Sequence, residues 1–197
     1  DPYSNSKVAV ENLIKEWRKT NNNKKIKISV ARAGNVVGGG DWSKNRLIPD
    51  LVRNISKKRK TFIRRPKSIR PWQYVLKVLQ GYLILAKKNY FSTKNQFNTA
   101  YNFGPRVSEC KTVHNVVREF KKNWDAQIIY KSNIKMFKET DYLFLNSKKA
   151  KLELNWLSSY SLKETIKKTC SWYKNFYFDK KNIYQISIKE IKDCLEK

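Results

Sequence analysis

The sequence predicts an α/β fold. Segments with apolar residues at helical spacing alternate along the chain with short apolar runs that are typical of buried strands. The chain has 197 residues, of which 40% are hydrophobic, so it can form one domain with a core of its own. No internal repeat or low-complexity linker divides it.

The helices are predicted from apolar stripes. In the first helix, Val8, Leu13 and Trp17 share one face, and a polar run that begins at Thr20 ends it. The expected helices cover residues 3–20, 47–56, 72–88, 113–124, 147–154, 162–176 and 187–195.

The strands are predicted from shorter patterns. Ile26 to Ala31 first alternates apolar and polar residues and then becomes apolar, as a strand that enters a covered sheet does. We expect a loop from Gly34 to Asn45 and a basic, proline-bearing loop that ends at Pro71. The expected strands cover residues 26–31, 61–63, 100–103 and 127–130, with a further apolar segment at 142–145.

The run Gly38-Gly39-Gly40 does not fit a phosphate-binding turn. A nucleotide-binding α/β fold places such a turn directly before a helix, so that the first amides of the helix receive the phosphates. Here the residues from Asp41 to Arg46 separate the glycines from the next expected helix. We interpret the run as a flexible loop.

The formal net charge of +27 allows two interpretations. A basic chain can bind nucleic acid through its phosphates. However, the lysines are spread along the sequence and most lie beside apolar residues at helical spacing, as on the solvated face of an amphipathic helix. We favour a solvated surface whose field attracts anionic small molecules such as nucleotide sugars, and we expect no nucleic-acid partner.

The cysteines and the histidine indicate no metal site. Cys110, Cys170 and Cys194 are far apart and match no zinc or disulfide spacing, which favours free thiols in the cytoplasm. We expect His114 to be a packed or surface residue rather than a ligand. No apolar run reaches the ~18–20 residues of a membrane span, so we expect no membrane partner. The only methionine is Met136, and we therefore expect a processed chain or the back part of a longer protein.

Tyr3 and Lys7 form a candidate catalytic pair. A spacing of four residues in a helix places both side chains on one face. An ammonium group close to a phenol favours the phenolate, which can then act as a general base near neutral pH. The spacing alone is common in a lysine-rich chain, so its meaning depends on the motifs that follow.

Several further motifs, taken in order, resemble one family over nearly the whole chain. The segments that carry the resemblance are Pro2–Lys7, Ala31–Trp42, Arg46–Asp50, Ile69–Leu76, Tyr101–Pro105 and Glu139–Leu145. Together they resemble the extended short-chain dehydrogenase/reductase superfamily and, within it, the CDP-glucose 4,6-dehydratases. Pro71 favours this branch, because the matching segment of dTDP-glucose dehydratases usually reads Arg-Asp-Trp.

The resemblance implies a mechanism and a cofactor. Tyr3 would take the proton of the sugar's 4-hydroxyl while a hydride passes to NAD, and Lys7 would hold the nicotinamide ribose. Asn35 and Arg70 match family positions that contact the nucleotide sugar, and Arg46 is a weaker candidate for the same role. A guanidinium can bond two phosphate oxygens at once, so an arginine beside a diphosphate is chemically sound.

The resemblance also implies how the chain is divided. Residues 1–197 would form a single incomplete domain, with 1–33 as the end of the Rossmann-like part and 34–197 mainly as the smaller, sugar-nucleotide-binding part. The glycine-rich dinucleotide turn and the residues that eliminate water would precede Asp1. Tyr74 replaces the family's usual histidine, and Phe137 to Asp141 departs from the family pattern as well.

Several functions stay open at this point. The leading one is NAD-dependent dehydration of CDP-glucose for deoxysugar and surface-polysaccharide synthesis, with the isolated chain inactive. A sibling nucleotide-sugar epimerase or dehydratase would share Tyr3 and Lys7. A basic nucleic-acid-binding module and a remnant without activity are the alternatives from other classes. Because the helix that carries Tyr3 often packs against a second subunit in this superfamily, the chain is a candidate homodimer.

Overall fold

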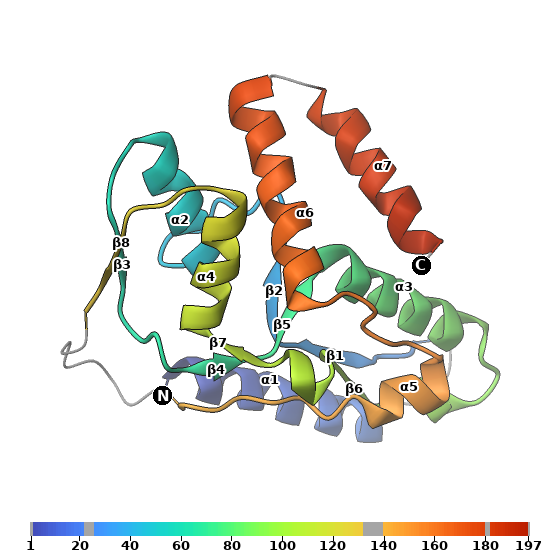
Figure 1. The fold of residues 1–197 in the computed structure, drawn as a ribbon. Helices are drawn as coiled ribbons and strands as arrows, with labels where there is room; N and C mark the ends of the chain where they lie inside the picture. Colours follow the sequence, from blue (N-terminus) through green and yellow to red (C-terminus); the bar gives the residue numbers. More distant parts are fainter. Residues whose placement is uncertain (1, 22–25, 132–139, 180–181, 197) are drawn as a thin grey trace.

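The computed structural model describes residues 2–21, 26–131, 140–179 and 182–196. Over these residues, helices surround short strands in an α/β arrangement (Figure 1). Helix α1 (Pro2–Thr20) lies along one side of the strands, and α6 (Leu162–Lys174) and α7 (Ile183–Leu195) stand on the other. None of the helices described is both long and apolar enough to span a membrane.

The remaining elements are short. The other helices are α2 (Leu47–Ser56), α3 (Val75–Phe91), α4 (Val113–Asn123) and α5 (Lys148–Leu154). The strands are β1 (Val30–Ala33), β2 (Asn35–Val37), β3 (Thr61–Ile63), β4 (Ile69–Arg70), β5 (Trp72–Tyr74), β6 (Ala100–Phe103), β7 (Lys111–Thr112) and β8 (Ile128–Tyr130).

The strands pair two by two. The pairs β1–β6, β2–β5 and β3–β8 are parallel, and β4–β7 is antiparallel. Parallel partners need a long connection between them, which the intervening helices provide. This topology brings segments that are far apart in the sequence to one place, and the β2–β5 pair is the part that builds the site described below.

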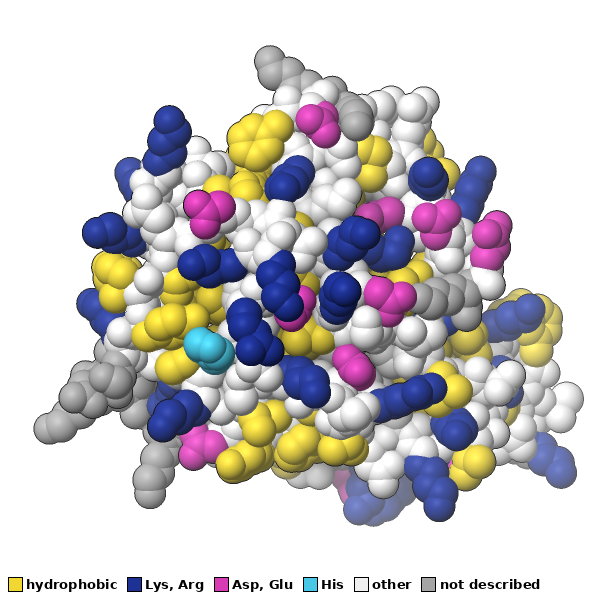
Figure 2. All heavy atoms as spheres, in the orientation of Figure 1, with side chains coloured by type: hydrophobic (Ala, Val, Ile, Leu, Met, Phe, Trp, Pro, Cys, Tyr) yellow, Lys and Arg dark blue, Asp and Glu magenta, His cyan; other side chains and the backbone are white. Residues whose placement is uncertain are grey.

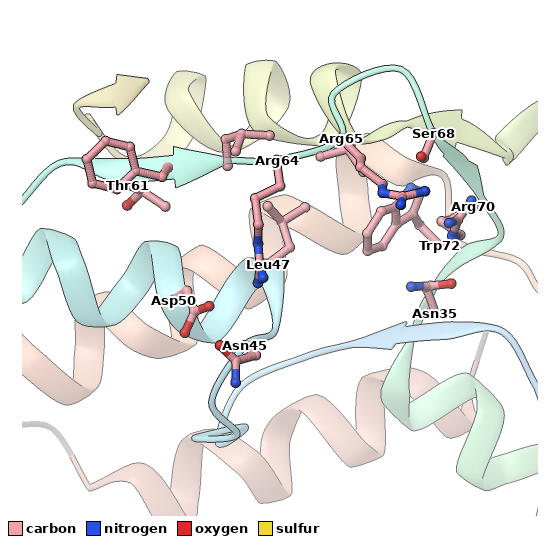
Figure 3. Close-up of a pocket in the computed structure, with 13 residues that line it drawn as sticks. Asn35, Asn45, Leu47, Asp50, Thr61, Arg64, Arg65, Ser68, Arg70 and Trp72 are labelled. Atoms are coloured by element: carbon pink, nitrogen blue, oxygen red, sulfur yellow. The ribbon is translucent and has the colours of Figure 1, made fainter. Parts of the chain in front are cut away.

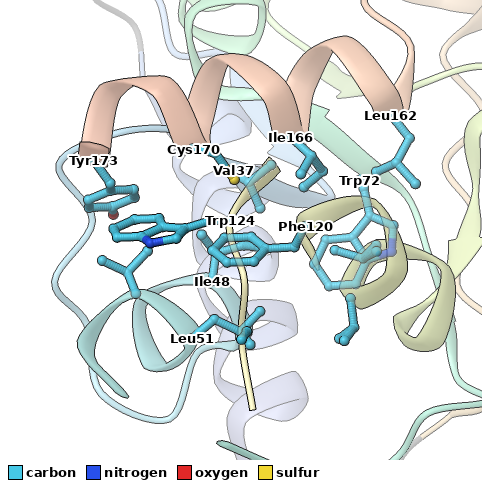
Figure 4. Close-up of a cluster of buried hydrophobic side chains, with 14 of the residues drawn as sticks. Val37, Ile48, Leu51, Trp72, Phe120, Trp124, Leu162, Ile166, Cys170 and Tyr173 are labelled. Atoms are coloured by element: carbon cyan, nitrogen blue, oxygen red, sulfur yellow. The ribbon is translucent and has the colours of Figure 1, made fainter. Parts of the chain in front are cut away.

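The main core lies between α2, α4 and α6 (Figure 4). Leu51, Phe120 and Ile166 come from these three helices, and each is 0% exposed. Burying a side chain of this size stabilises a fold by about 1.5–3 kcal/mol. A capping box at Ser161 and Glu164 begins α6, so the helix has a defined start above this core.

A second core joins β6 to α3 and α5. Tyr101, Phe103 and Trp156 are buried there, and the Trp156 indole donates a hydrogen bond of 2.9 Å to the carbonyl of Lys77 on α3. A buried indole needs such an acceptor. This contact fixes α3, which directly follows β5.

Most predicted elements are confirmed, and several boundaries are wrong. The helix at 47–56 and the strands at 61–63 and 100–103 have the expected limits. The expected strand at 26–31 lies instead at Val30–Ala33, and the last helix begins at Ile183 rather than at 187. The apolar segment 142–145 forms only an isolated bridge between Tyr142 and Ile69.

Two further errors have one cause. The expected loop 34–45 contains β2, and the expected helix 72–88 begins as β5 before α3 starts at Val75. These two strands pair with each other in parallel. Local periodicity does not show such a long-range pairing, so a three-residue strand before a helix reads as its first turn.

The triple glycine lies in a turn outside the helices and strands, as expected for a loop, and it is closely packed. Gly38 is buried, and a Cβ there would lie 2.3 Å from Val75. At Gly39 a Cβ would lie 2.2 Å from the Trp172 ring, and Gly40 has a φ of +81°. The first two glycines are therefore needed for close packing and the third for its backbone conformation.

Candidate functional site

A cavity of about 200 Å³ lies where β2, β3, β4 and β5 meet the start of α2 (Figure 3). The side chains around it are mainly polar and cationic. They include Asn35, Asn45, Asp50, Thr61, Arg64, Arg65, Ser68, Arg70 and Trp72. The cavity therefore suits a polar anion of small-molecule size.

Asn35 is placed in this wall by strand pairing. It is the first residue of β2, and its backbone N–H donates a hydrogen bond of 3.0 Å to the carbonyl of Pro71. Its side-chain amide is not part of this bond. The residue before it is Gly34, where a Cβ would lie 2.5 Å from the Pro71 ring. A glycine at this point lets the two chain segments approach closely enough to pair.

Arg70 reaches the same cavity from β4. Its side chain is 8% exposed, and its Nη1 donates hydrogen bonds to the carbonyls of Ile69, at 2.9 Å, and Asp141, at 3.3 Å. These acceptors fix the direction of the guanidinium. The structure thus brings Asn35 and Arg70 together, as the sequence motifs suggested.

Arg64 and Arg65 were missed as site residues. Both line the cavity, and Figure 3 shows Arg64 extending from the end of β3 toward α2, whereas Arg65 lies on the side of Arg70 and Trp72. The sequence held a signal for them in the basic run from Arg64 to Lys67, which we interpreted only as a loop. With Arg70, they give one cavity three guanidinium groups.

Arg46 lies at a neighbouring cavity. This second space, of about 260 Å³, shares Asn35, Asn45, Leu47 and Trp72 with the first, and Arg46 lines only the second. Asn45 has a φ of +62°, in the left-handed region that asparagine tolerates better than most residues. The two cavities are therefore separate parts of one polar region.

Arg53 holds the loop between the two cavities. It donates to the Asp50 carboxylate at 2.6 Å and to the carbonyls of Trp42, at 2.9 Å, and Ser43, at 3.2 Å. One side chain thus ties the loop that contains Asn45 to α2.

Tyr3 and Lys7 lie together but do not line these cavities. The Lys7 Nζ is 5.3 Å from the centre of the Tyr3 ring, and Tyr3 is 69% exposed. Neither residue is among those that line the two cavities. The described residues therefore present two separate groups, one with a phenol and an ammonium and the other with amides and guanidinium groups.

Helix α1 is held to β1 by polar contacts. Arg32 donates to the Glu11 carboxylate through Nε at 2.6 Å and also through Nη2, and Arg18 donates to the carbonyl of Ile28 at 2.6 Å. The Arg32 hydrogen bond lowers the pKa of Glu11, and Glu11 in turn raises the pKa of Arg32. No residue of α1 is fully buried, and these polar contacts help to hold the helix in place.

His114 and the cysteines form no metal-binding cluster among the residues that the structure describes. His114 is exposed, and its ring lies 5.3 Å from that of Tyr130. The three cysteines are free, and no cluster of possible ligands occurs among the residues that the structure describes. Of the expected family departure at 137–141, residues 137–139 fall outside the described part of the chain.

The basic side chains cover the surface broadly. Figure 2 shows lysine and arginine spread over much of one face, with several acidic side chains among them. The arginines of the cavity differ from this general surface charge, because three of them line one cavity.

Comparison with known proteins gives a consistent result. The family model described as GDP-mannose 4,6 dehydratase matches residues 1–169. A curated CDP-glucose 4,6-dehydratase of Salmonella typhimurium is 38% identical over 182 residues, which cover 88% of this chain and 50% of that protein. The chain thus spans about half the length of the curated relative.

Solved structures show the same fold. A UDP-glucuronic acid 4-epimerase from Bacillus cereus, in complex with UDP-glucuronic acid and NAD, aligns with a TM-score of 0.74 and 18% identity over 90% of this chain and 54% of that one. A dTDP-glucose 4,6-dehydratase from Bacillus anthracis, in complex with NAD, aligns with a TM-score of 0.69 and 19% identity over 91% and 55%. The predicted α/β class is confirmed.

Proposed function

Because the chain belongs to the GDP-mannose 4,6-dehydratase family, we propose that it is part of an enzyme that dehydrates CDP-glucose to CDP-4-keto-6-deoxyglucose. The chain would supply the sugar-nucleotide pocket and the catalytic tyrosine. The observation that carries the proposal is the cavity that Asn35 and Arg70 line together with Arg64 and Arg65.

The cavity suits the diphosphate of a nucleotide sugar. Guanidinium groups bond phosphate oxygens in pairs, and the Asn35 amide can donate to a further oxygen. Two features favour CDP-glucose over other nucleotide sugars: the name of the 38% identical relative and the run Arg70-Pro71-Trp72-Gln73.

NAD is the proposed cofactor, and Tyr3 and Lys7 would lie at its nicotinamide end. Both side chains are exposed on one face of α1, so an ammonium and a phenol are accessible to the same group. Lys7 would bind the hydroxyls of the nicotinamide ribose. When bound, NAD would accept a hydride from the sugar and later return it.

The chain's own residues would carry the proton chemistry at C4. Tyr3 would take the proton of the 4-hydroxyl as the hydride at C4 departs, so that a ketone forms at C4. The ketone acidifies the proton at C5, so that water can leave from C6. Asn35 and Arg70 would hold the nucleotide so that the sugar stays in place during these steps.

A sibling epimerase or another nucleotide-sugar dehydratase is the second candidate. The same fold occurs in the UDP-glucuronic acid 4-epimerase, and the family model carries the name of a GDP-mannose enzyme. Isothermal titration with CDP-, dTDP-, UDP- and GDP-sugars would separate these substrates. Tightest binding of the CDP-sugar supports our proposal, and preference for another base supports the sibling enzyme.

The remaining parts of the proposal concern location and assembly. Free cysteines fit the reducing cytoplasm, and a homodimer through α1 fits the exposure of that helix. The chain alone would bind the nucleotide sugar but not turn it over. The decisive experiment supplies the intact gene product with NAD and CDP-glucose and detects loss of one water by mass spectrometry. No product with any nucleotide sugar would overturn the proposal.

A further inference from the structure

Three consecutive side chains of β5 each donate a hydrogen bond to a different element. The Trp72 indole donates to the carbonyl of Lys111 on β7 at 2.9 Å, and the Gln73 amide donates to that of Phe103 on β6 at 2.7 Å. The Tyr74 hydroxyl donates to the Glu190 carboxylate on α7 at 2.8 Å. The three donors are between 1% and 5% exposed, so β5 is fixed from three directions.

The contact with α7 is the one that comes from the end of the chain. Tyr74 packs with Tyr160 and Cys194 in a small core, and the rings of Tyr74 and Tyr160 are 5.1 Å apart. Burial raises the pKa of Glu190, while the Tyr74 hydroxyl and Lys168 lower it and Asp193 raises it. A carboxylate in these surroundings depends on the Tyr74 hydroxyl as a donor.

Two further contacts hold α7 against α6. The Trp172 indole donates to the Ser187 hydroxyl at 3.0 Å, and Lys168 lies 4.0 Å from Asp193. Figure 1 shows α7 beside α6 and above α3, the helix that begins directly after Tyr74. Helix α7 thus contacts both α6 and the last residue of β5.

This helix lies beyond the part of the chain that matches the family model, which ends at residue 169. Tyr74, the residue that it contacts, lies inside the matched part. One hydrogen bond therefore joins the helix beyond residue 169 to a strand within the matched part.

We propose that α7 clamps β5, and that Glu190 is a positioning residue for the substrate pocket through its bond to Tyr74. Tyr74 pairs with Val37, two residues from the register pair of Trp72 and Asn35. Because Asn35 and Trp72 line both cavities, a shift of β5 moves the pocket wall. The role of the pocket rests on the proposed function, whereas the clamp itself does not.

The test is hydrogen exchange measured by mass spectrometry on the chain as it stands. Glu190→Ala should speed exchange of the amides of β2 and β5 about fivefold, as expected for loss of one net hydrogen bond, relative to those of α4 in the core. Glu190→Gln keeps an acceptor and should retain the protection. Glu196→Gln, at the exposed end of the same helix, is the charge-matched control.

The outcomes separate the clamp from a general loss of stability. Equal acceleration in α4, or no acceleration in β2 and β5, would overturn the clamp, and so would failure of Glu190→Gln to preserve protection. Tyr74→Phe, which removes only the hydroxyl, serves if Glu190→Ala does not fold. It should give the same selective acceleration.

A second readout connects the clamp to the pocket. The affinity for CDP, measured by isothermal titration on folded protein, should fall severalfold in Glu190→Ala and stay unchanged in Glu196→Gln. Unchanged affinity in Glu190→Ala would overturn the positioning role. If the unmodified chain does not bind CDP, the proposed substrate is wrong, and the exchange experiment still decides the clamp.

Discussion

Asn35 and Trp72 occupy one register position of the parallel β2–β5 pair, and both side chains line the same two cavities. Paired residues in neighbouring strands point to the same side of the sheet, so this position fixes an amide and an indole beside each other. The pocket therefore depends on a pairing between two segments that are far apart in the sequence.

Replacing Arg64 with alanine should weaken binding of CDP. A charge-assisted hydrogen bond is worth about 1.5–3 kcal/mol, which corresponds to an affinity loss of roughly 10- to 150-fold. Arg64→Lys should recover part of it, because an ammonium keeps the charge but not the paired donors. Arg59→Ala, at an exposed arginine outside the cavity, is the control, and an equal loss there would show a general charge effect.

Replacing Tyr3 with phenylalanine should remove dehydration by the intact enzyme and leave the affinity for CDP unchanged. A general base contributes about 10²- to 10⁴-fold to a rate, whereas Tyr3 does not line the cavity that we propose for the nucleotide. Steady-state rates and titration calorimetry measure the two effects separately. Full activity of the variant would contradict the role of Tyr3.

Replacing Gly39 with alanine should destabilise the fold by about 1–3 kcal/mol, because the new methyl group would overlap the Trp172 ring. Thermal unfolding measures this loss. In a double-mutant cycle, Trp172→Leu should reduce the cost of the alanine, since the two positions share one space. Independent effects of the two substitutions would show that the ring does not impose the glycine.

Replacing Glu11 with glutamine should lower stability at neutral pH and have little effect in acid. Arg32 lowers the pKa of Glu11 below its ordinary value of 4.5 in the folded chain. The carboxylate therefore stabilises the fold above that value, and the contribution is lost as the pH falls through the folded-state pKa. The pair is partly exposed, so we expect less than about 1 kcal/mol.

The measurement is thermal unfolding of the unmodified chain and of Glu11→Gln from neutral to acid pH. The difference in melting temperature should shrink as the pH falls. A difference that stays constant would mean that Glu11 acts through packing rather than through its charge.

Nucleic acid should bind only weakly. The charge of +27 favours phosphate contacts, but such contacts are lost steeply as salt rises. Fluorescence anisotropy with a labelled duplex should show no saturable binding at about 150 mM salt, near physiological ionic strength. Tight binding under these conditions would favour the basic-module alternative.

The sequence was sufficient where a local pattern coincides with a complete element. The stripe of α2 and the apolar run of β6 gave the right limits, because helix and strand periodicity is local. The motifs also identified Asn35 and Arg70, which the structure places at one cavity. The roles of all five residues, Tyr3, Lys7, Asn35, Arg46 and Arg70, stay predictions.

Local patterns failed where pairing across the chain decided the conformation. Trp72 to Tyr74 reads as the first turn of a helix, and only its ladder with β2 makes it a strand. Arg64 and Arg65 look like ordinary surface charge in a lysine-rich chain. They line the cavity because β3 ends beside the same space as β4 and β5.

The sequence by itself determined the α/β class, the family and the spacing that puts Tyr3 and Lys7 on one face, because each depends on residues close together in the chain. The tertiary structure alone decided the cavity, the packing of Trp172 on Gly39 and the bond from Tyr74 to Glu190. These depend on contacts between distant segments. Such contacts form only when folding buries the apolar side chains between the helices.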